Sequence, residues 1–261
     1  PPDERGYCGV RENRGGAYKT LVHSRPCSLN IDPIEKKPMF HFLPGTKAFS
    51  LATAGCNIEC QFCQNWQISQ MRPEQLTQGT QYAPPAAIAR AAAENDCRSI
   101  AYTYSEPVVF YEYVRDIAGE ARARGVKSAM ISNGYIQEQP IRDLAPRLDA
   151  IKIDLKSFTE SFYRDYCRGE LKPVLQTLEI VKGLGLWLEI VVLIIPTLND
   201  GEVECRDLCR WVKRNLGPET PVHFTRFHPM YKLQNLPSTP VETLDRNFSI
   251  ARSEGLYYPY V

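Results

Sequence analysis

The chain alternates short apolar runs with longer segments in which apolar residues recur every three or four positions. The apolar runs are residues 48–55, 99–104, 127–134, 150–155, 186–195 and 221–227. The segments between them have helical periodicity, and several end at glycine, as helices often do. Strands that alternate with helices predict parallel pairing, because each crossover helix returns the chain to the same end of the sheet. The pattern therefore predicts an α/β fold built from six strand–helix units.

The first 46 residues follow a different pattern. They lack long helical periodicity and are rich in Pro, Gly and Arg, which indicates short strands and turns. We therefore predict an N-terminal strand and loop extension over residues 1–46 and a barrel or partial barrel of the TIM type over residues 47–261. The abrupt opening Pro1-Pro2 and the strand-like ending GLYYPYV lead us to expect further segments on both sides.

The composition is typical of a folded protein and bears on its partners and its cellular setting. Apolar residues make up 43% of the chain and aromatic residues 10%, which favours a globule over a disordered chain. Lys and Arg number 31 against 30 Asp and Glu, so no global charge indicates a nucleic acid partner. We find no apolar run that predicts a membrane span, and nine clustered or scattered cysteines without a leader favour a reducing, cytoplasmic setting.

Three of the cysteines, Cys56, Cys60 and Cys63, are close together in GCNIECQFCQNW, directly after the first predicted strand. Structural zinc usually takes four ligands, whereas this cluster supplies three. An iron–sulfur cluster held by three cysteines keeps one iron open to another ligand. The spacing therefore favours an open [4Fe–4S] site. A zinc site or a closed iron–sulfur carrier, completed by a distant fourth ligand, is the alternative interpretation.

Polar motifs also follow the other five predicted strands. These motifs are YSEP, SNGY, DLK, PTLND and FHPMY, in chain order. In an α/β barrel, the loops after the carboxyl ends of the strands meet at one mouth, where the chemistry sits. The placement of the motifs in these loops therefore supports a functional site.

The spacing C-x3-C-x-aromatic-C, formed by Cys56, Cys60, Phe62 and Cys63, resembles the signature of the radical S-adenosylmethionine (radical SAM) superfamily. The resemblance implies a partial (β/α)6 TIM-like barrel and a [4Fe–4S] cluster on the three cysteines, with S-adenosylmethionine (SAM) on the open iron and Phe62 beside the cofactors. It further implies an enzyme that receives an electron from a low-potential donor, cleaves SAM reductively and abstracts hydrogen from a substrate.

The same resemblance assigns Glu106 in TYSEP to the acid of the family's Gly-Gly-Glu segment, which meets the amino group of SAM. Tyr104 and Ser105 stand in the places of the two glycines, and we predict Tyr104 to be catalytic. Taken alone, Glu106 fits equally well as a cap of the following helix, because acids favour helix N-termini.

Asp154 and Lys156 in KIDLK are similar to the Asp-Leu-Lys segment of the activases of glycyl radical enzymes, in which the lysine pairs with the SAM carboxylate. The alternative is a pair at the end of a strand, partly in solvent. Glu189 interrupts a nearly continuous apolar strand, where an unpaired charge is costly, and is predicted to bind the ribose hydroxyls.

Asn133 in SNGY matches the Asn-Gly turn of the activases, where it implies cofactor binding, although a plain Asn-Gly turn is an equal alternative. His228 in FHPMY resembles the Phe-His segment of the activases. It is a second predicted catalytic residue, near SAM or the substrate, against the alternative that a histidine before proline is structural.

Three longer segments, DPIEKKPMFHFLPG, GCNIECQFCQNWQISQ and YTYSEPVVFYEY, resemble the radical SAM enzymes of the AmmeMemoRadiSam system, which are related to pyruvate formate-lyase activating enzymes. This resemblance implies companions of the Memo and AMMECR1 families. The expected substrate is a partner protein, as for an activase, and the alternative is a small metabolite or a nucleoside.

Overall fold

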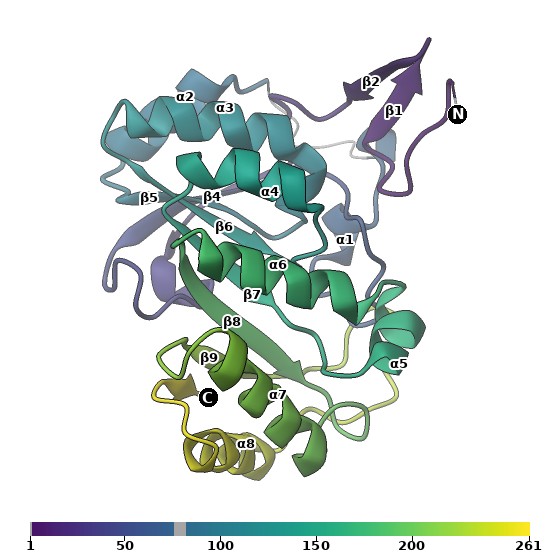
Figure 1. The fold of residues 1–261 in the computed structure, drawn as a ribbon. Coiled ribbons are helices and arrows are strands. Elements are labelled where there is room, and N and C mark those ends of the chain that lie inside the picture. Colours follow the sequence, from purple (N-terminus) through teal and green to yellow (C-terminus); the bar gives the residue numbers. More distant parts are fainter. Residues whose placement is uncertain (1, 76–81) are drawn as a thin grey trace. The chain divides into compact units, whose positions relative to one another are not determined.

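The computed structural model describes residues 2–75 and 82–261, so Pro1 of the predicted extension lies outside it. Contacts divide the chain into two compact units, and each is considered by itself (Figure 1). The first unit comprises Pro1–Ile58, Asn65–Ser132 and Asp143–Ala150, and the second comprises Glu59–Gln64, Asn133–Arg142 and Ile151–Val261.

The first unit holds most of the N-terminal half of the chain. Its strands are β1 (Arg11–Arg14), β2 (Ala17–Thr20), β3 (Ser28–Pro33), β4 (Lys47–Ala52), β5 (Ser99–Tyr102) and β6 (Lys127–Ser132). Its helices are α1 (Trp66–Ser69), α2 (Pro85–Glu94) and α3 (Tyr111–Arg122), with short 3₁₀ turns η1 (Ile34–Lys36), η2 (Pro73–Gln75), η3 (Pro107–Phe110) and η4 (Ala145–Arg147). Helix α4 (Glu138–Leu144) contributes residues to both units.

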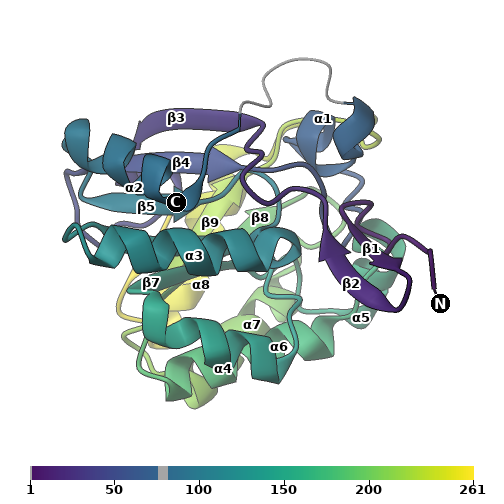
Figure 2. The ribbon, with the colours of Figure 1, turned by 90° about the horizontal axis from the view of Figure 1, so that it is seen from above.

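The sheet of the first unit has the order β3-β4-β5-β6. β4, β5 and β6 pair in parallel, whereas β3 runs antiparallel to β4, with Ser28 opposite Ala52 and Pro33 opposite Lys47. β1 and β2 form a separate antiparallel hairpin. Helices α2 and α3 contact each other and this sheet, as both views of the ribbon show (Figure 2). Because helices cover its strands, β4 and β5 are almost wholly buried and mainly apolar.

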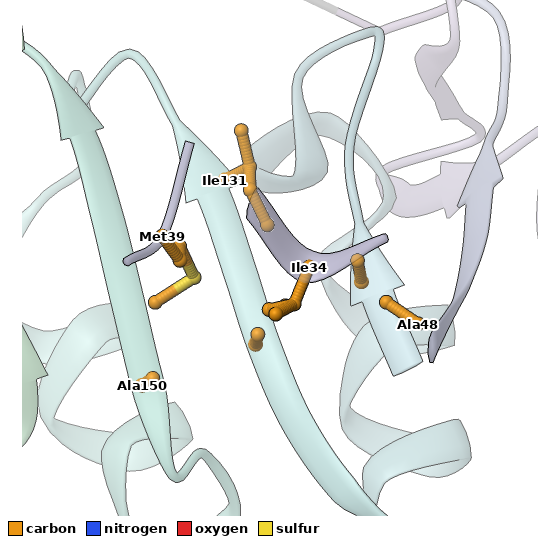
Figure 3. Packing of buried hydrophobic residues seen from close by; sticks show 7 residues of the cluster. Ile34, Met39, Ala48, Ile131 and Ala150 are labelled. Atoms are coloured by element: carbon orange, nitrogen blue, oxygen red, sulfur yellow. The ribbon is translucent and has the colours of Figure 1, made fainter. Parts of the chain in front are cut away.

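The N-terminal segment supplies part of the core of this unit. Ile34 in η1 and Met39 just after it are fully buried against one face of the sheet (Figure 3). The sheet side of this cluster consists mainly of alanines, Ala48, Ala101, Ala129 and Ala150, together with Ile131. The small alanine side chains make room for the two larger ones, so the segment fills a space that the strands alone would leave empty.

The second unit holds strands β7 (Ala150–Asp154, apart from its first residue), β8 (Trp187–Ile194), β9 (Val222–Arg226) and β10 (Pro259–Tyr260), in this order. β8 pairs in parallel with β9, and β9 with β10. Its helices are α5 (Glu160–Phe162), α6 (Leu171–Gly183), α7 (Glu202–Asn215) and α8 (Val241–Ser253), and a π-helical turn, η5, covers Tyr163–Cys167. Helices α7 and α8 pack together, and α8 also contacts β9 (Figure 1).

The predicted α/β fold with a mostly parallel sheet is confirmed. The six predicted strands of the core appear as β4 to β9, and the predicted helices include α2, α3, α6 and α7. Helix α8 was not predicted, because the buried polar residues Thr243 and Asn247 interrupt its apolar repeat. Within the described residues, no helix combines the length and the apolar character that a membrane span requires.

Candidate active site

The segment that carries the cysteines leaves β4 through a closely packed glycine. Gly55 has a φ of 97°, and a Cβ atom there would lie 2.8 Å from Val10 Cγ1 and 2.9 Å from the carbonyl oxygen of Cys8. The Gly55 N–H donates a hydrogen bond to the Ile68 carbonyl oxygen at 3.0 Å. The backbone that leads into Cys56 is therefore fixed from two sides within the first unit.

The next part of the segment, residues 59–64, belongs to the second unit and is fastened to the π-helical turn η5. The Glu59 N–H donates to the Cys167 carbonyl oxygen at 2.8 Å, and the Gln61 N–H donates to the Tyr166 carbonyl oxygen at 2.9 Å. π-helical turns in proteins often occur at functional sites. Here the turn provides carbonyl groups that hold the backbone around Cys60.

Cys60, Phe62 and Cys63 lie in this segment, residues 59–64. The ring of Phe62 is buried, and its centroid lies 5.7 Å from that of Phe162. The Cys63 N–H donates to the Cys60 carbonyl oxygen at 3.2 Å, which closes a tight turn. Cys60 is buried and Cys63 is half-buried. Packing against α5 therefore fixes Phe62, and its predicted contact with a cofactor stays a prediction.

The three thiols are divided between the units, since Cys56 belongs to the first and Cys60 and Cys63 to the second. In the parts of the chain that the structure describes, no group of three or more His, Cys, Asp or Glu side chains is placed to hold a metal ion. The three-cysteine site is therefore still a prediction from the sequence spacing. The structure shows that hydrogen bonds fix the backbone just before Cys56 and the backbone around Cys60.

Tyr104 adopts an unusual backbone conformation in the loop after β5. Its φ is 66°, and the Ser105 N–H donates to the Thr103 carbonyl oxygen at 2.9 Å, so Tyr104 is the central residue of a three-residue γ-turn. A γ-turn with positive φ is rare and strained for a residue other than glycine. The Tyr104 hydroxyl donates to the Asp32 carboxylate, and burial together with this carboxylate raises the pKa of Tyr104 to about 12.

Glu106 follows this γ-turn and is almost fully buried. Its Oε1 accepts hydrogen bonds from the Val108 N–H at 3.1 Å and from the Ser132 hydroxyl at 2.7 Å. The alternative role of Glu106 as the cap of the following helical turn, η3, is therefore confirmed. Its predicted contact with the amino group of SAM is compatible with this position and remains a prediction.

Asn133 and Gly134 form the turn that follows β6. Asn133 Oδ1 accepts a hydrogen bond from the Tyr135 N–H at 2.8 Å, which is the local pattern of an Asx turn. Gly134 has a φ of 73°, and a Cβ atom there would lie 2.9 Å from Ile153 Cγ2. The predicted Asn-Gly turn is confirmed, and cofactor binding by Asn133 stays a prediction.

Strand β7 ends in a group of three charged side chains. Lys152 and Lys156 both donate to the Asp154 carboxylate, Lys152 to Oδ1 and Lys156 to Oδ2, the latter at 2.9 Å. Burial alone would raise the pKa of Asp154, but the two ammonium groups outweigh it and lower this pKa to about 2. The group therefore carries one negative and two positive charges. Lys152 was missed in the sequence, although it lies two positions before Asp154 and alternation places both on one strand face.

The surroundings of Lys156 favour its charged form and fix its backbone. Burial disfavours its charge, yet the Asp154 carboxylate and, next, the negative charge of an ionised Cys60 raise the pKa of Lys156 well above its usual value. The Lys156 N–H donates to the Tyr163 hydroxyl oxygen at 3.0 Å, and Asn199 Nδ2 donates to the Lys156 carbonyl oxygen at 2.9 Å. Tyr163 and Asn199 were not predicted individually, because only the fold brings them to this strand end.

Glu189 lies on β8 with its side chain fully buried. Trp187 Nε1 donates to Glu189 Oε1 at 3.0 Å, and His223 Nε2 lies 2.8 Å from Glu189 Oε2. The His223 ring stacks on the Tyr260 ring with a centroid distance of 5.1 Å. The structure thus explains how a charge is accommodated in an apolar strand. Ribose binding by Glu189 stays a prediction, and it would have to share these oxygens with partners in the protein.

His228 lies in the exposed loop after β9. Its Nδ1 is 3.0 Å from the Ser238 hydroxyl oxygen. The backbone beside it is anchored, because the Phe227 N–H donates to the Thr239 hydroxyl oxygen at 2.9 Å and this hydroxyl donates to the Ile194 carbonyl oxygen at 2.6 Å. The loop is therefore tied to the end of β8, and the catalytic role of His228 stays a prediction.

Comparisons with known proteins bear on this fold and its strand-end loops. Residues 50–209 match the family model described as the Radical SAM superfamily. An uncharacterized protein of Methanocaldococcus jannaschii, MJ0808, is 44% identical to this chain over 258 residues, which cover 99% of this chain and 76% of the relative. More than half of the chain is thus matched by one family model.

Solved structures share the fold at low sequence identity. A radical SAM methyltransferase from Sphaerobacter thermophilus has a TM-score of 0.63 at 17% identity and covers 84% of this chain and 67% of its own. A domain of a pyruvate-formate lyase-activating enzyme from Bacteroides vulgatus has a TM-score of 0.54 at 16% identity, covering 61% of this chain and 95% of the domain.

The fold is of the α/β class with a mostly parallel sheet, and it is consistent with a partial TIM-like barrel. The candidate site residues lie at or after the ends of its strands. Since the family model covers the segment from β4 to α7, which includes the three cysteines, the chain belongs to the radical SAM superfamily.

Proposed function

We propose that this protein is a radical SAM enzyme in which Cys56, Cys60 and Cys63 hold a [4Fe–4S] cluster. The observation that carries the proposal is the three-cysteine segment itself, which follows β4 and lies inside the region matched by the superfamily model. Thiolates are the ligands that iron–sulfur clusters use. The fixed backbones before Cys56 and around Cys60 fit a site that holds its ligands in place.

The residues of the strand-end loops would bind and orient SAM. Lys156, kept charged by Asp154, is suited to the SAM carboxylate, since an ammonium group pairs well with a carboxylate. Glu106 and the carbonyl groups of the preceding turn are suited to its amino group. Tyr163 and Asn199 hold the backbone of Lys156 and thereby its side chain. With SAM and a reduced cluster bound, the site would supply hydrogen abstraction from an unactivated carbon.

A closed iron–sulfur carrier or a zinc protein is the competing function. A carrier does not need Lys156 as a cation close to Cys60, whereas an enzyme that binds the carboxylate of an amino acid does. The charge group Lys152–Asp154–Lys156 therefore favours the enzyme. A carrier would also need a fourth protein ligand for its metal.

For the substrate, we propose a partner protein on which the enzyme acts in the manner of an activase. The domain of pyruvate-formate lyase-activating enzyme with a related fold supports this choice. The AmmeMemoRadiSam resemblance adds companions of the Memo and AMMECR1 families to the proposal. The radical SAM chemistry adds a low-potential electron donor, and the cysteine usage adds a cytoplasmic setting. A small metabolite or nucleoside is the second candidate, kept open because Tyr104 and Ser105 replace the two glycines of the family's Gly-Gly-Glu segment.

The test is anaerobic reconstitution with iron and sulfide, followed by reduction and addition of SAM. We expect a change in the electron paramagnetic resonance spectrum of the cluster on SAM addition and formation of 5'-deoxyadenosine. An unchanged spectrum without nucleoside product, in protein that holds its iron, would contradict the proposal and favour a closed cluster.

A matched pair of cysteine variants separates the cluster ligands from other thiols. Cys56→Ala is expected to lose most of the bound iron and all SAM cleavage. Cys27→Ala removes another half-buried thiol of the first unit and is expected to keep both. Equal iron content in the two variants would show that Cys56 is not a ligand.

A further inference from the structure

The proposed chemistry gives no role to the segment DPIEKKP, although two of its charged residues, Lys36 and Lys37, bond to a third, Asp32. Asp32 at the end of β3 is buried, with 5% of its surface exposed. Its carboxylate accepts hydrogen bonds from Lys36 Nζ at 2.9 Å, from Lys37 Nζ at 2.5 Å and from the Tyr104 hydroxyl. Lys37 is buried as well, and its Nζ lies 5.0 Å from the centroid of the Tyr104 ring.

Two segments about 70 residues apart in sequence thus meet at one side chain, since Tyr104 is separated from Asp32 by 72 positions. Tyr104 is also the centre of the strained γ-turn after β5. A tyrosine holds a positive φ only where its surroundings fix it, whereas glycine adopts such a φ without a side-chain penalty. Asp32 binds the hydroxyl of Tyr104, and Lys37 covers its ring.

The strained turn is connected to both neighbouring parts of the proposed site. Glu106 follows the turn directly, and its carboxylate bonds to the Val108 N–H and the Ser132 hydroxyl. The Glu106 N–H points to the Gly55 carbonyl oxygen at 3.5 Å, one residue before Cys56. A change in the Tyr104 conformation would therefore move Glu106.

We propose that Asp32 and Lys37 are positioning residues that clamp Tyr104 in its positive-φ turn and so fix Glu106 and the turn carbonyls for the SAM amino group. This inference rests on the proposed function for its consequence, but the clamp itself is a property of the protein without cofactors. It assigns Tyr104 a positioning role in place of the catalytic role predicted from the sequence.

The first experiment measures the clamp without cofactors, by hydrogen–deuterium exchange of the peptide that covers residues 103–108. Tyr104→Phe removes only the hydroxyl bonded to Asp32 and is expected to speed this exchange about tenfold, the scale set by one lost buried hydrogen bond. Tyr102→Phe is the matched control, because the buried Tyr102 at the end of β5 bonds to Ser128 instead, and the exchange of residues 103–108 should be unchanged in this variant. Equal exchange in Tyr104→Phe and the wild type would overturn the clamp.

The second experiment tests whether the clamp serves the turn, by measuring SAM affinity of the reconstituted protein at matched iron content. Asp32→Asn is expected to weaken SAM binding roughly tenfold in the wild-type background. In the Tyr104→Gly background it should change the affinity less than about twofold, because glycine takes the positive φ without a clamp. The same loss in both backgrounds would overturn the proposal, since Asp32 would then act independently of Tyr104.

The two proposals can fail separately. If the wild-type protein holds its cluster but binds no SAM, the proposed function fails, while the exchange of residues 103–108 still decides whether the clamp exists. If SAM binds and is cleaved but the exchange of Tyr104→Phe equals that of the wild type, the clamp alone is refuted.

Discussion

Asp154 is the residue on which the charges at the end of β7 depend. It lies between the ammonium groups of the buried Lys152 and the half-buried Lys156, and without it these two cations would lack their shared carboxylate. Removing one partner of a buried ion group destabilises a protein because the remaining charge stays desolvated. The arrangement therefore couples the stability of the protein to the ionisation of one carboxyl group.

This coupling predicts a pH dependence. The pKa of Asp154 is about 2 in the folded protein, below its value of about 4 in an unfolded chain. The stabilisation is therefore complete above about pH 4 and is lost as the pH falls toward 2. We expect the difference in unfolding free energy between the wild type and Asp154→Asn to shrink by roughly 2 kcal/mol from pH 6 to pH 2.

Urea unfolding followed by circular dichroism at both pH values measures this difference. Asp245→Asn, on the exposed side of α8, is the control and should change the unfolding free energy by less than about 0.5 kcal/mol at either pH. A wild-type advantage over Asp154→Asn that is equal at pH 6 and pH 2 would contradict the proposed ionisation.

At the scale of residues, local contacts of a side chain can be predicted from the sequence better than its contacts with distant residues. Glu106 as a cap and Asn133 in a turn were predictable, because both act on backbone groups two residues away. Tyr163 and Asn199, which hold Lys156, were not, since their partner lies 7 and 43 positions away. Local chemistry can be inferred from spacing, whereas contacts between distant loops are set by the fold.

At the scale of elements, helix and strand periodicity was informative wherever one face of an element is apolar. α7 shows this well, because its buried residues include Cys205, Leu208, Cys209 and Val212 at helical spacing. Cys205 and Cys209 are one helical turn apart on this apolar face, and both are buried. The π-helical turn η5 could not be predicted, since its wider backbone follows from packing and not from the repeat of its residues.

The turn between β6 and α4 is tested at Gly134, where a side chain has little room. In Gly134→Ala, the new Cβ would lie 2.9 Å from Ile153 Cγ2 and 3.1 Å from Val174 Cγ1, in a backbone with φ of 73°. Strain and overlap together are expected to lower the unfolding free energy by about 2–4 kcal/mol. Denaturant unfolding measures this loss.

The control for this substitution is Gly119→Ala, inside helix α3, where a Cβ meets nothing within 4 Å. Alanine is a better helix former than glycine, so this variant should be more stable than the wild type by about 0.5–1 kcal/mol. If Gly134→Ala were as stable as Gly119→Ala, the turn would not need glycine.

At the scale of the whole molecule, the sequence predicted the fold class and the six core strands because a parallel α/β pattern repeats along the chain. The change of pattern near residue 46 separates a region without α-helices from one with them. Contacts instead group that region with β4, β5 and β6, because β3 pairs with β4 and Ile34 and Met39 fill the core beneath. Periodicity reports secondary structure, but it does not report which segment completes a core.

The last prediction follows from this packing and concerns a chain that begins at residue 47. Such a chain lacks β3 and the buried side chains of Val10, Val22, Ile34 and Met39. Loss of a large buried apolar side chain typically removes about 2–5 kcal/mol, so the sum is comparable with the roughly 5–15 kcal/mol that stabilises a domain. We expect the shortened chain to unfold without a cooperative transition. A peptide of residues 26–46, which contains β3, Ile34 and Met39, should restore a transition when added, and a scrambled peptide of the same composition should not. Cooperative unfolding of the chain 47–261 alone, near the full-length midpoint, would show that the core is complete without its N-terminal segment.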